Sequence, residues 1–147
     1  MTSGSPVTAS DAELASRLRL AVTRLARRLR TQLPGELSPS QLATLSTVER
    51  HGPLTLGELS TAERVKPPTM TKIVSCLEEQ GLVTRTVDRS DRRVARVEAT
   101  AAGLRFLDSS RQKKDAYLAE RLRTLDTDDR AALERAADVL ERLLNDS

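Results

Sequence analysis

Hydroxyl and ammonium side chains gather between residues 66 and 75, at the start of a segment with helical periodicity. Apolar residues recur from Met70 at i, i+3, i+4 and i+7, which predicts a helix of about residues 67–80 with one buried side. The polar groups then lie on the opposite side, where they can donate hydrogen bonds to phosphate oxygens and to base edges in a major groove. The candidate DNA-contacting residues of this helix are Lys66, Pro68, Thr69, Thr71, Lys72 and Ser75.

A second charged group, Asp-Arg-Ser-Asp-Arg-Arg at 88–93, separates two segments in which apolar residues alternate. This alternation predicts two strands, and hence a hairpin, or wing, over about residues 82–99. Its arginines, Arg89, Arg92 and Arg93, could reach a minor groove, where the negative potential is deepest over narrow A·T-rich tracts. Charges at a loop tip are usually only a solvated surface, so it is the preceding helix that favours DNA here.

Two further helix starts precede these elements. Ser38-Pro39-Ser40-Gln41 supplies an N-cap, a proline at the first helical position and a glutamine at the third. Thr55 with Glu58 forms another capping box. Three helices followed by a hairpin is the element order of a winged helix-turn-helix, which we expect over residues 35–100. The expected fold class is therefore mostly α with a small β hairpin (α+β).

The remaining residues predict long helices outside the winged domain, about six helices in all. Residues 1–10 are rich in Ser, Thr, Gly and Pro and are expected to be flexible, and Ser10 with Glu13 predicts the capping box of a helix within 11–34. Residues 101–147 predict two more helices. The first and last helices each carry an apolar stripe, which is expected to pack against another apolar surface. Their candidate interface residues are Leu14, Leu18, Leu25, Leu133, Ala137, Leu140 and Leu144.

The composition excludes several classes of protein. One cysteine and one histidine among 147 residues exclude a metal site built mainly from Cys and His, and aromatic residues at 1% argue against stacking on single-stranded nucleic acid. We find no nucleophile paired with a base and no phosphate loop, so we expect neither an enzyme nor a cofactor. No apolar run approaches the roughly 20 residues of a membrane span, and residues 1–10 do not form a signal peptide. We therefore expect a cytoplasmic protein with no membrane partner.

The charge distribution is compatible with a polyanionic partner. The net charge is +3, and residues 64–98, which hold the candidate helix and wing, contain eight basic and five acidic residues. This excess is small, and on charge alone an ordinary solvated surface explains it as well as DNA does.

Three motifs resemble the MarR family of bacterial transcription regulators. They are Leu-Glu-Glu-Gln-Gly-Leu-Val-Thr-Arg at 77–85, Asp-Arg-Arg at 91–93 and Thr-Ala-Ala-Gly at 100–103. The resemblance spans nearly the whole chain, and the wing pattern of Asp-x-Arg followed by Thr-x-x-Gly is its most specific part. The family usually has leucine before that threonine, where this chain has Ala99.

The resemblance implies a homodimer whose two winged domains hang from a platform formed by the first and last helices. It also implies that Arg93 enters the minor groove, that Asp91 shapes the wing, and that Thr69, Thr71 and Lys72 read bases in the major groove. The two recognition helices would lie about 34 Å apart on an imperfect palindrome of double-stranded DNA. We expect a repressor released by a small-molecule effector bound between the winged domain and the platform.

Alternatives to this interpretation stay open. The winged domain could serve protein contacts, although Thr, Lys and Ser on its helix suit DNA better than aromatic anchors would. Cys76 could sense peroxide, as a cysteine does in some relatives, but its place beside Ile73 and Leu77 favours a small buried thiol. An unliganded regulator is also compatible with the scarcity of aromatic residues.

Overall fold

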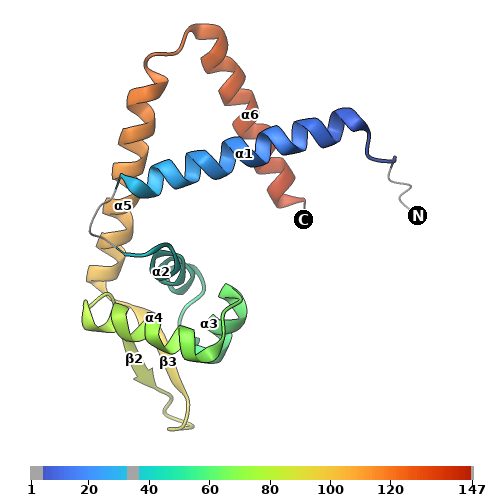
Figure 1. The fold of residues 1–147 in the computed structure, drawn as a ribbon. Helices are drawn as coiled ribbons and strands as arrows, with labels where there is room; N and C mark the ends of the chain where they lie inside the picture. Colours follow the sequence, from blue (N-terminus) through green and yellow to red (C-terminus); the bar gives the residue numbers. More distant parts are fainter. Residues whose placement is uncertain (1–4, 33–36, 147) are drawn as a thin grey trace.

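The structure is a computed structural model that describes residues 5–32 and 37–146. Figure 1 shows a winged domain at one end and a pair of long helices at the other, joined by α5. The elements in chain order are α1 (Ala9–Thr31), α2 (Pro39–His51), β1 (Leu54–Thr55), α3 (Leu56–Glu63), α4 (Pro67–Glu79), β2 (Val83–Val87), β3 (Ala95–Ala99), α5 (Ala101–Leu122) and α6 (Thr127–Asn145).

The first helix starts earlier than its sequence predicts. Thr8 is the N-cap, its hydroxyl accepts from the Asp11 N–H at 3.1 Å, and the Asp11 carboxylate accepts from the Thr8 N–H at 2.9 Å. The box predicted at Ser10 and Glu13 is therefore wrong. Both sites offer a hydroxyl with an acid three residues later, and the earlier one adds further helical hydrogen bonds. The predicted end of this helix, near residue 34, lies outside the described residues.

The capping boxes of the next two helices are confirmed. The Ser38 hydroxyl accepts from the Gln41 N–H at 3.2 Å, and the Gln41 side chain accepts from the Ser38 N–H at 3.1 Å. The Thr55 hydroxyl accepts from the Glu58 N–H at 3.1 Å. These reciprocal bonds occupy amide groups that a helix leaves without partners, and so they fix where α2 and α3 begin.

The sheet has three strands where the sequence predicts two. β2 and β3 pair antiparallel with Val83 opposite Ala99 and Val87 opposite Ala95, as expected for the hairpin. β1 adds to the other edge of β3, with Leu54 opposite Val97. Two residues are too few to show the alternating pattern of a strand. Only the pairing with β3 identifies β1 as a strand.

One hydrophobic core holds the winged domain together. It lies between α2, α3, α4 and the sheet, and Leu107 from α5 closes it. Burying such side chains is worth about 1.5–3 kcal/mol each. The core residues are Leu45, Val48, Leu59, Met70, Ile73, Val74, Leu77, Leu82, Val83, Val97 and Leu107.

The two outer helices have no buried residue among those described. Leu14 and Leu144 are 55% and 77% exposed, and Leu18, Leu25 and Leu133 are exposed as well. In a single chain the apolar stripes of α1 and α6 therefore remain uncovered. Within the described residues, no helix is both long and apolar enough to cross a membrane.

Candidate nucleic-acid interface

The recognition helix α4 is held by its apolar side and is open on the other. Met70, Val74 and Leu77 are fully buried against α2 and α3. The turn from α3 passes through Arg64 in the left-handed region at φ 54°, and Lys66 then occupies the N-cap position of α4, without a capping side-chain bond, ahead of the two prolines. Prolines fit the first turn because its N–H groups have no partner within the helix. This arrangement exposes the start of α4, as an insertion into a groove requires.

The candidate residues of α4 differ in how free they are. Lys66, Thr69 and Lys72 are exposed, and Pro68 is exposed beside them. The Thr71 hydroxyl donates to the Pro67 carbonyl at 3.0 Å and can still accept a hydrogen bond. Ser75 is half-buried, so it is the least accessible of the set.

Sequence reasoning missed Arg85, which connects the wing to α4. Its Nη2 donates to the Ser75 hydroxyl at 3.3 Å, and its Nε lies 3.3 Å from the Glu78 carboxylate. Ser75 therefore contacts the first wing strand. No sequence signal predicts this pairing, because it depends on how β2 packs beside α4.

Cys76 is exposed, which corrects the expectation of a buried thiol. The helix turns 100° per residue, so Cys76 lies outside the buried sector even though Leu77 follows it. It shares a side of α4 with Lys72, one turn earlier. The only cysteine of the chain therefore belongs to the exposed surface of the recognition helix.

The wing tip presents three exposed arginines, one of which is paired within the loop. The Asp91 carboxylate accepts from Arg93 Nε at 3.1 Å and Nη2 at 3.3 Å, and these bonds lower the pKa of Asp91. The Arg93 side chain is nevertheless 90% exposed. Among the described residues, neither Arg89 nor Arg92 has an ion-pair partner, and both are exposed.

A second acidic residue, Asp88, connects the base of this loop to its tip. One carboxylate oxygen accepts from the Ser90 N–H at 2.8 Å and from the Ser90 hydroxyl at 2.6 Å. The other accepts from Arg96 Nη1 at 2.7 Å. Stabilisation of the anion by Ser90, and then by Arg96, lowers the pKa of Asp88 to about 2. Asp88 is therefore ionised at neutral pH.

The wing base explains the Thr-x-x-Gly motif. The Thr100 hydroxyl donates to the Gly81 carbonyl at 2.6 Å and accepts from the Gly103 N–H at 3.1 Å, so it caps α5 and holds the start of β2. Gly81 needs its glycine because its φ is +73°. A Cβ on Gly103 would lie 2.1 Å from the Leu82 carbonyl oxygen. The motif thus sets how closely α5 approaches the wing.

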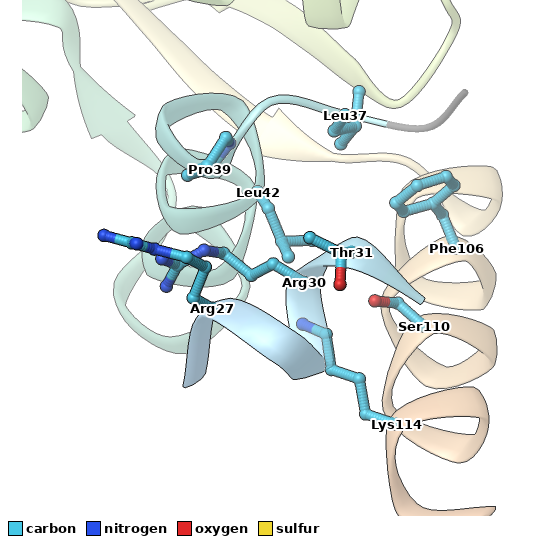
Figure 2. A pocket seen from close by; sticks show the side chains of 9 residues that line it. All are labelled: Arg27, Arg30, Thr31, Leu37, Pro39, Leu42, Phe106, Ser110 and Lys114. Atoms are coloured by element: carbon cyan, nitrogen blue, oxygen red, sulfur yellow. The ribbon is translucent and has the colours of Figure 1, made fainter. Parts of the chain in front are cut away.

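A cavity of about 260 Å³ lies where α1, α2 and α5 meet. Leu37, Leu42 and Phe106 give it apolar walls, while Arg30 and Lys114 approach from α1 and α5 (Figure 2). The buried Ser110 hydroxyl has no hydrogen-bond partner. The other lining residues are Arg27, Thr31 and Pro39.

Next to this cavity, Arg111 of α5 binds Glu49 of α2 through two hydrogen bonds of 3.2 and 3.0 Å. Glu49 raises the pKa of Arg111. The pair joins the long helix to the winged domain. Within the part of the chain that the structure describes, no group of three His, Cys, Asp or Glu side chains could hold a metal ion.

An exposed helix after a tight turn, followed by an arginine-bearing hairpin, defines a winged helix-turn-helix DNA-binding protein. Residues 37–95 match the model of the MarR family. An uncharacterized HTH-type transcriptional regulator of Mycobacterium leprae is 41% identical over 139 residues, which is 94% of this chain and 97% of that protein. The chain therefore belongs to the MarR family: it is a DNA-binding transcription regulator and not an enzyme.

Solved structures agree with this fold. A MarR family protein from Bacillus stearothermophilus superposes with a TM-score of 0.74 at 28% identity, covering 92% of this chain and 96% of that one. A point mutant of MepR from Staphylococcus aureus, solved with a bound oligodeoxyribonucleotide, has a TM-score of 0.70 at 18% identity, covering 91% and 98%.

Proposed function

We propose that the chain acts as a homodimeric repressor that binds an imperfect palindrome of double-stranded DNA and is released by a small molecule. The observation that carries the proposal is that the two elements with exposed polar and basic residues, α4 and the hairpin, lie together. They form the end of the molecule opposite the α5–α6 turn (Figure 1). A regulator of this kind works where the chromosome is, so we place it in the cytoplasm.

In this proposal α4 enters the major groove by its N-terminal half. Lys66 and Lys72 contact phosphates or guanine edges, and the hydroxyls of Thr69 and Thr71 contact base edges. All four side chains are exposed, and neither lysine has an ion-pair partner among the described residues. The oligonucleotide bound to the MepR mutant supports DNA as the ligand of this fold.

The wing contacts the neighbouring minor groove. Arg89 and Arg92 are free to bind phosphates, whereas Arg93 leaves or shares the Asp91 carboxylate when it enters the groove. Because Asp91 and Arg93 are only two residues apart, the carboxylate holds the guanidinium at the tip before DNA arrives. Asp91 therefore preorganises the arginine, and its own charge is compensated.

A second copy of the chain covers the apolar stripes of α1 and α6. Leu14, Leu18 and Leu25 recur along one side of α1, and Leu133 and Leu144 recur along α6. Stripes of this length on two helices are typical of an interface between copies. Ala137 and Leu140, which follow the same side of α6, complete the proposed contact.

A titration followed by fluorescence anisotropy tests the proposal on DNA from upstream of the gene, against scrambled DNA, at two salt concentrations. We expect one dimer per site, with log affinity falling by about 0.9 per neutralised phosphate for each unit of log salt. R93A should weaken binding across sequences, and K72A should change preference at particular bases. R123A, distant from the wing on the α5 C-cap, is the matched control. Equal, feeble binding to both DNAs would contradict the proposal and favour a protein-contact module.

The cavity at the meeting of α1, α2 and α5 is the proposed effector site. Its apolar walls, the cations Arg30 and Lys114 and the unpartnered Ser110 hydroxyl suit a small apolar anion. A ligand there contacts α1 and α5 as well as α2, so it can shift the winged domain relative to the platform. Such a shift changes the separation of the two recognition helices and releases DNA.

Sodium benzoate and neutral benzamide are matched probes for this site. We expect benzoate to raise Tm and weaken DNA binding more than benzamide does, because only the anion pairs with the cations. K114Q should reduce this difference, since Arg30 remains, while R105Q, on the same helix but outside the cavity, should keep it in full. Identical effects of both probes on the wild type would contradict an anionic effector.

A further inference from the structure

Asp88 connects three parts of the wing through its backbone and its side chain. Asp88 follows directly after β2, and its N–H donates to the Val94 carbonyl at 2.9 Å, so its backbone closes the loop. Its side chain accepts two hydrogen bonds from Ser90 at the tip and one from Arg96 in β3. One residue thus joins the first strand, the loop and the second strand.

Arg96 gives this carboxylate a fixed partner. It lies in β3, the central strand of the sheet, opposite Thr86 on one side and Thr55 on the other. Loops anchored only at their ends are mobile, whereas a strand paired on both edges is not. A 2.7 Å bond between charged groups, with side chains 36% and 26% exposed, therefore holds the loop against the rigid part of the sheet.

The same pair removes a charge that would oppose DNA. The loop over 88–93 carries three arginines and two aspartates. Asp91 is compensated within the loop by Arg93, and Asp88 is compensated from outside it by Arg96. Arg89 and Arg92 therefore have no acidic partner among the described residues, and their charges remain available for phosphates.

We propose that Arg96 is a positioning residue for DNA binding: through Asp88 it fixes the wing tip and leaves Arg89 and Arg92 free for the minor groove and its phosphates. Arg96 itself does not contact DNA. The inference rests on the proposed insertion of the wing. It assigns a function to two residues outside the Asp-x-Arg pattern of the wing.

The test is hydroxyl-radical footprinting on a site selected from random DNA by the wild-type protein. Hydroxyl radicals report contacts in the minor groove, so the wing should protect the flanks of the site. In R96M we expect flank protection to be lost and affinity to fall roughly tenfold, while protection around the α4 contacts remains. R96K, which keeps a charged donor, should restore most of the flank protection.

Two further variants separate positioning from stability. D88N keeps an oxygen that accepts from Ser90 but loses the charge pair, so it should resemble R96M even if R96M folds poorly. R123M breaks the exposed Arg123–Glu120 pair of 3.3 Å, far from the wing, and should leave the footprint unchanged.

Wild-type flank protection that persists in folded R96M and D88N would overturn the inference and leave the proposed function intact. If the wild type itself protects no flanks, the proposed wing contact fails, and this inference fails with it. A loss of protection in R123M equal to that in R96M would show a general effect of stability and would likewise overturn the inference.

Discussion

At the scale of single residues, Gly103 lets α5 pack close to the wing because glycine has no Cβ. A Cβ there would lie 2.1 Å from the Leu82 carbonyl oxygen, which is backbone and cannot rotate away. We expect G103A to cost about 1–3 kcal/mol of unfolding free energy and to lower Tm by several degrees. Gly57→Ala is the control, since its Cβ meets only the Thr55 hydroxyl at 3.9 Å. Equal Tm values for both variants would contradict this role of the motif.

The thiol of Cys76 offers a chemical test, also at a single residue, of whether α4 contacts DNA. Because its thiol is exposed on α4, we expect N-ethylmaleimide to label it in the native protein and to block DNA binding. Saturating DNA should slow the labelling, whereas C76S should bind DNA normally and resist the reagent. Labelling at the same rate with and without DNA would place α4 outside the groove.

The exposure of Cys76 also keeps the peroxide-sensing alternative testable. If oxidation of this thiol releases DNA, C76S binds DNA and ignores peroxide. A wild-type complex that peroxide does not disturb would end the redox alternative.

At the scale of elements, the wing should respond to acid through Asp88. Its pKa in the folded state is about 2, below the ordinary value of about 4, so its contribution to stability is present above pH 4 and is lost as the pH falls towards 2. We expect urea unfolding of D88N to depend less on pH than that of the wild type across this window. Parallel curves for the two proteins would show that the Ser90 and Arg96 bonds do not stabilise the fold.

The elements also show what a sequence can predict. The boxes at Ser38 and Thr55 are local, since cap and partner are three residues apart, and the structure has both. The start of α1 differs by two residues from its prediction because two similar boxes compete at Thr8 and Ser10. The strand β1 has no sequence signal because only pairing with β3 defines it.

In the candidate site, too, local features could be predicted from the sequence and contacts between distant residues could not. Which side of α4 faces outward follows from the period of its apolar residues, so the sequence predicts the exposure of Thr69 and Lys72, whereas the burial expected for Cys76 is wrong. The bonds of Arg85 and Arg96 join residues that meet only in the folded wing. Their partners depend on strand register and helix packing, which cannot be predicted from the neighbouring residues in the sequence.

At the scale of the whole molecule, the proposed function requires two chains. Leu14→Glu and Leu144→Glu place a charge within the apolar stripes of α1 and α6, where burial of an unpaired carboxylate is costly. We expect both variants to be monomeric by light scattering and to lose tight DNA binding while keeping their helical content. Leu20→Glu, off the stripe of α1 and also exposed, is the control. A dimer that persists in both stripe variants would contradict the proposed platform.

The most direct test of the central claim is a dimethyl sulfate protection experiment on the selected DNA site. The reagent reports guanine N7 in the major groove, where α4 is expected to insert. We expect two protected patches, related by the dyad of the palindrome and about 34 Å apart, each lost in a monomeric variant. A single patch, or no protection of guanine N7 at saturating protein, would contradict the insertion of two recognition helices.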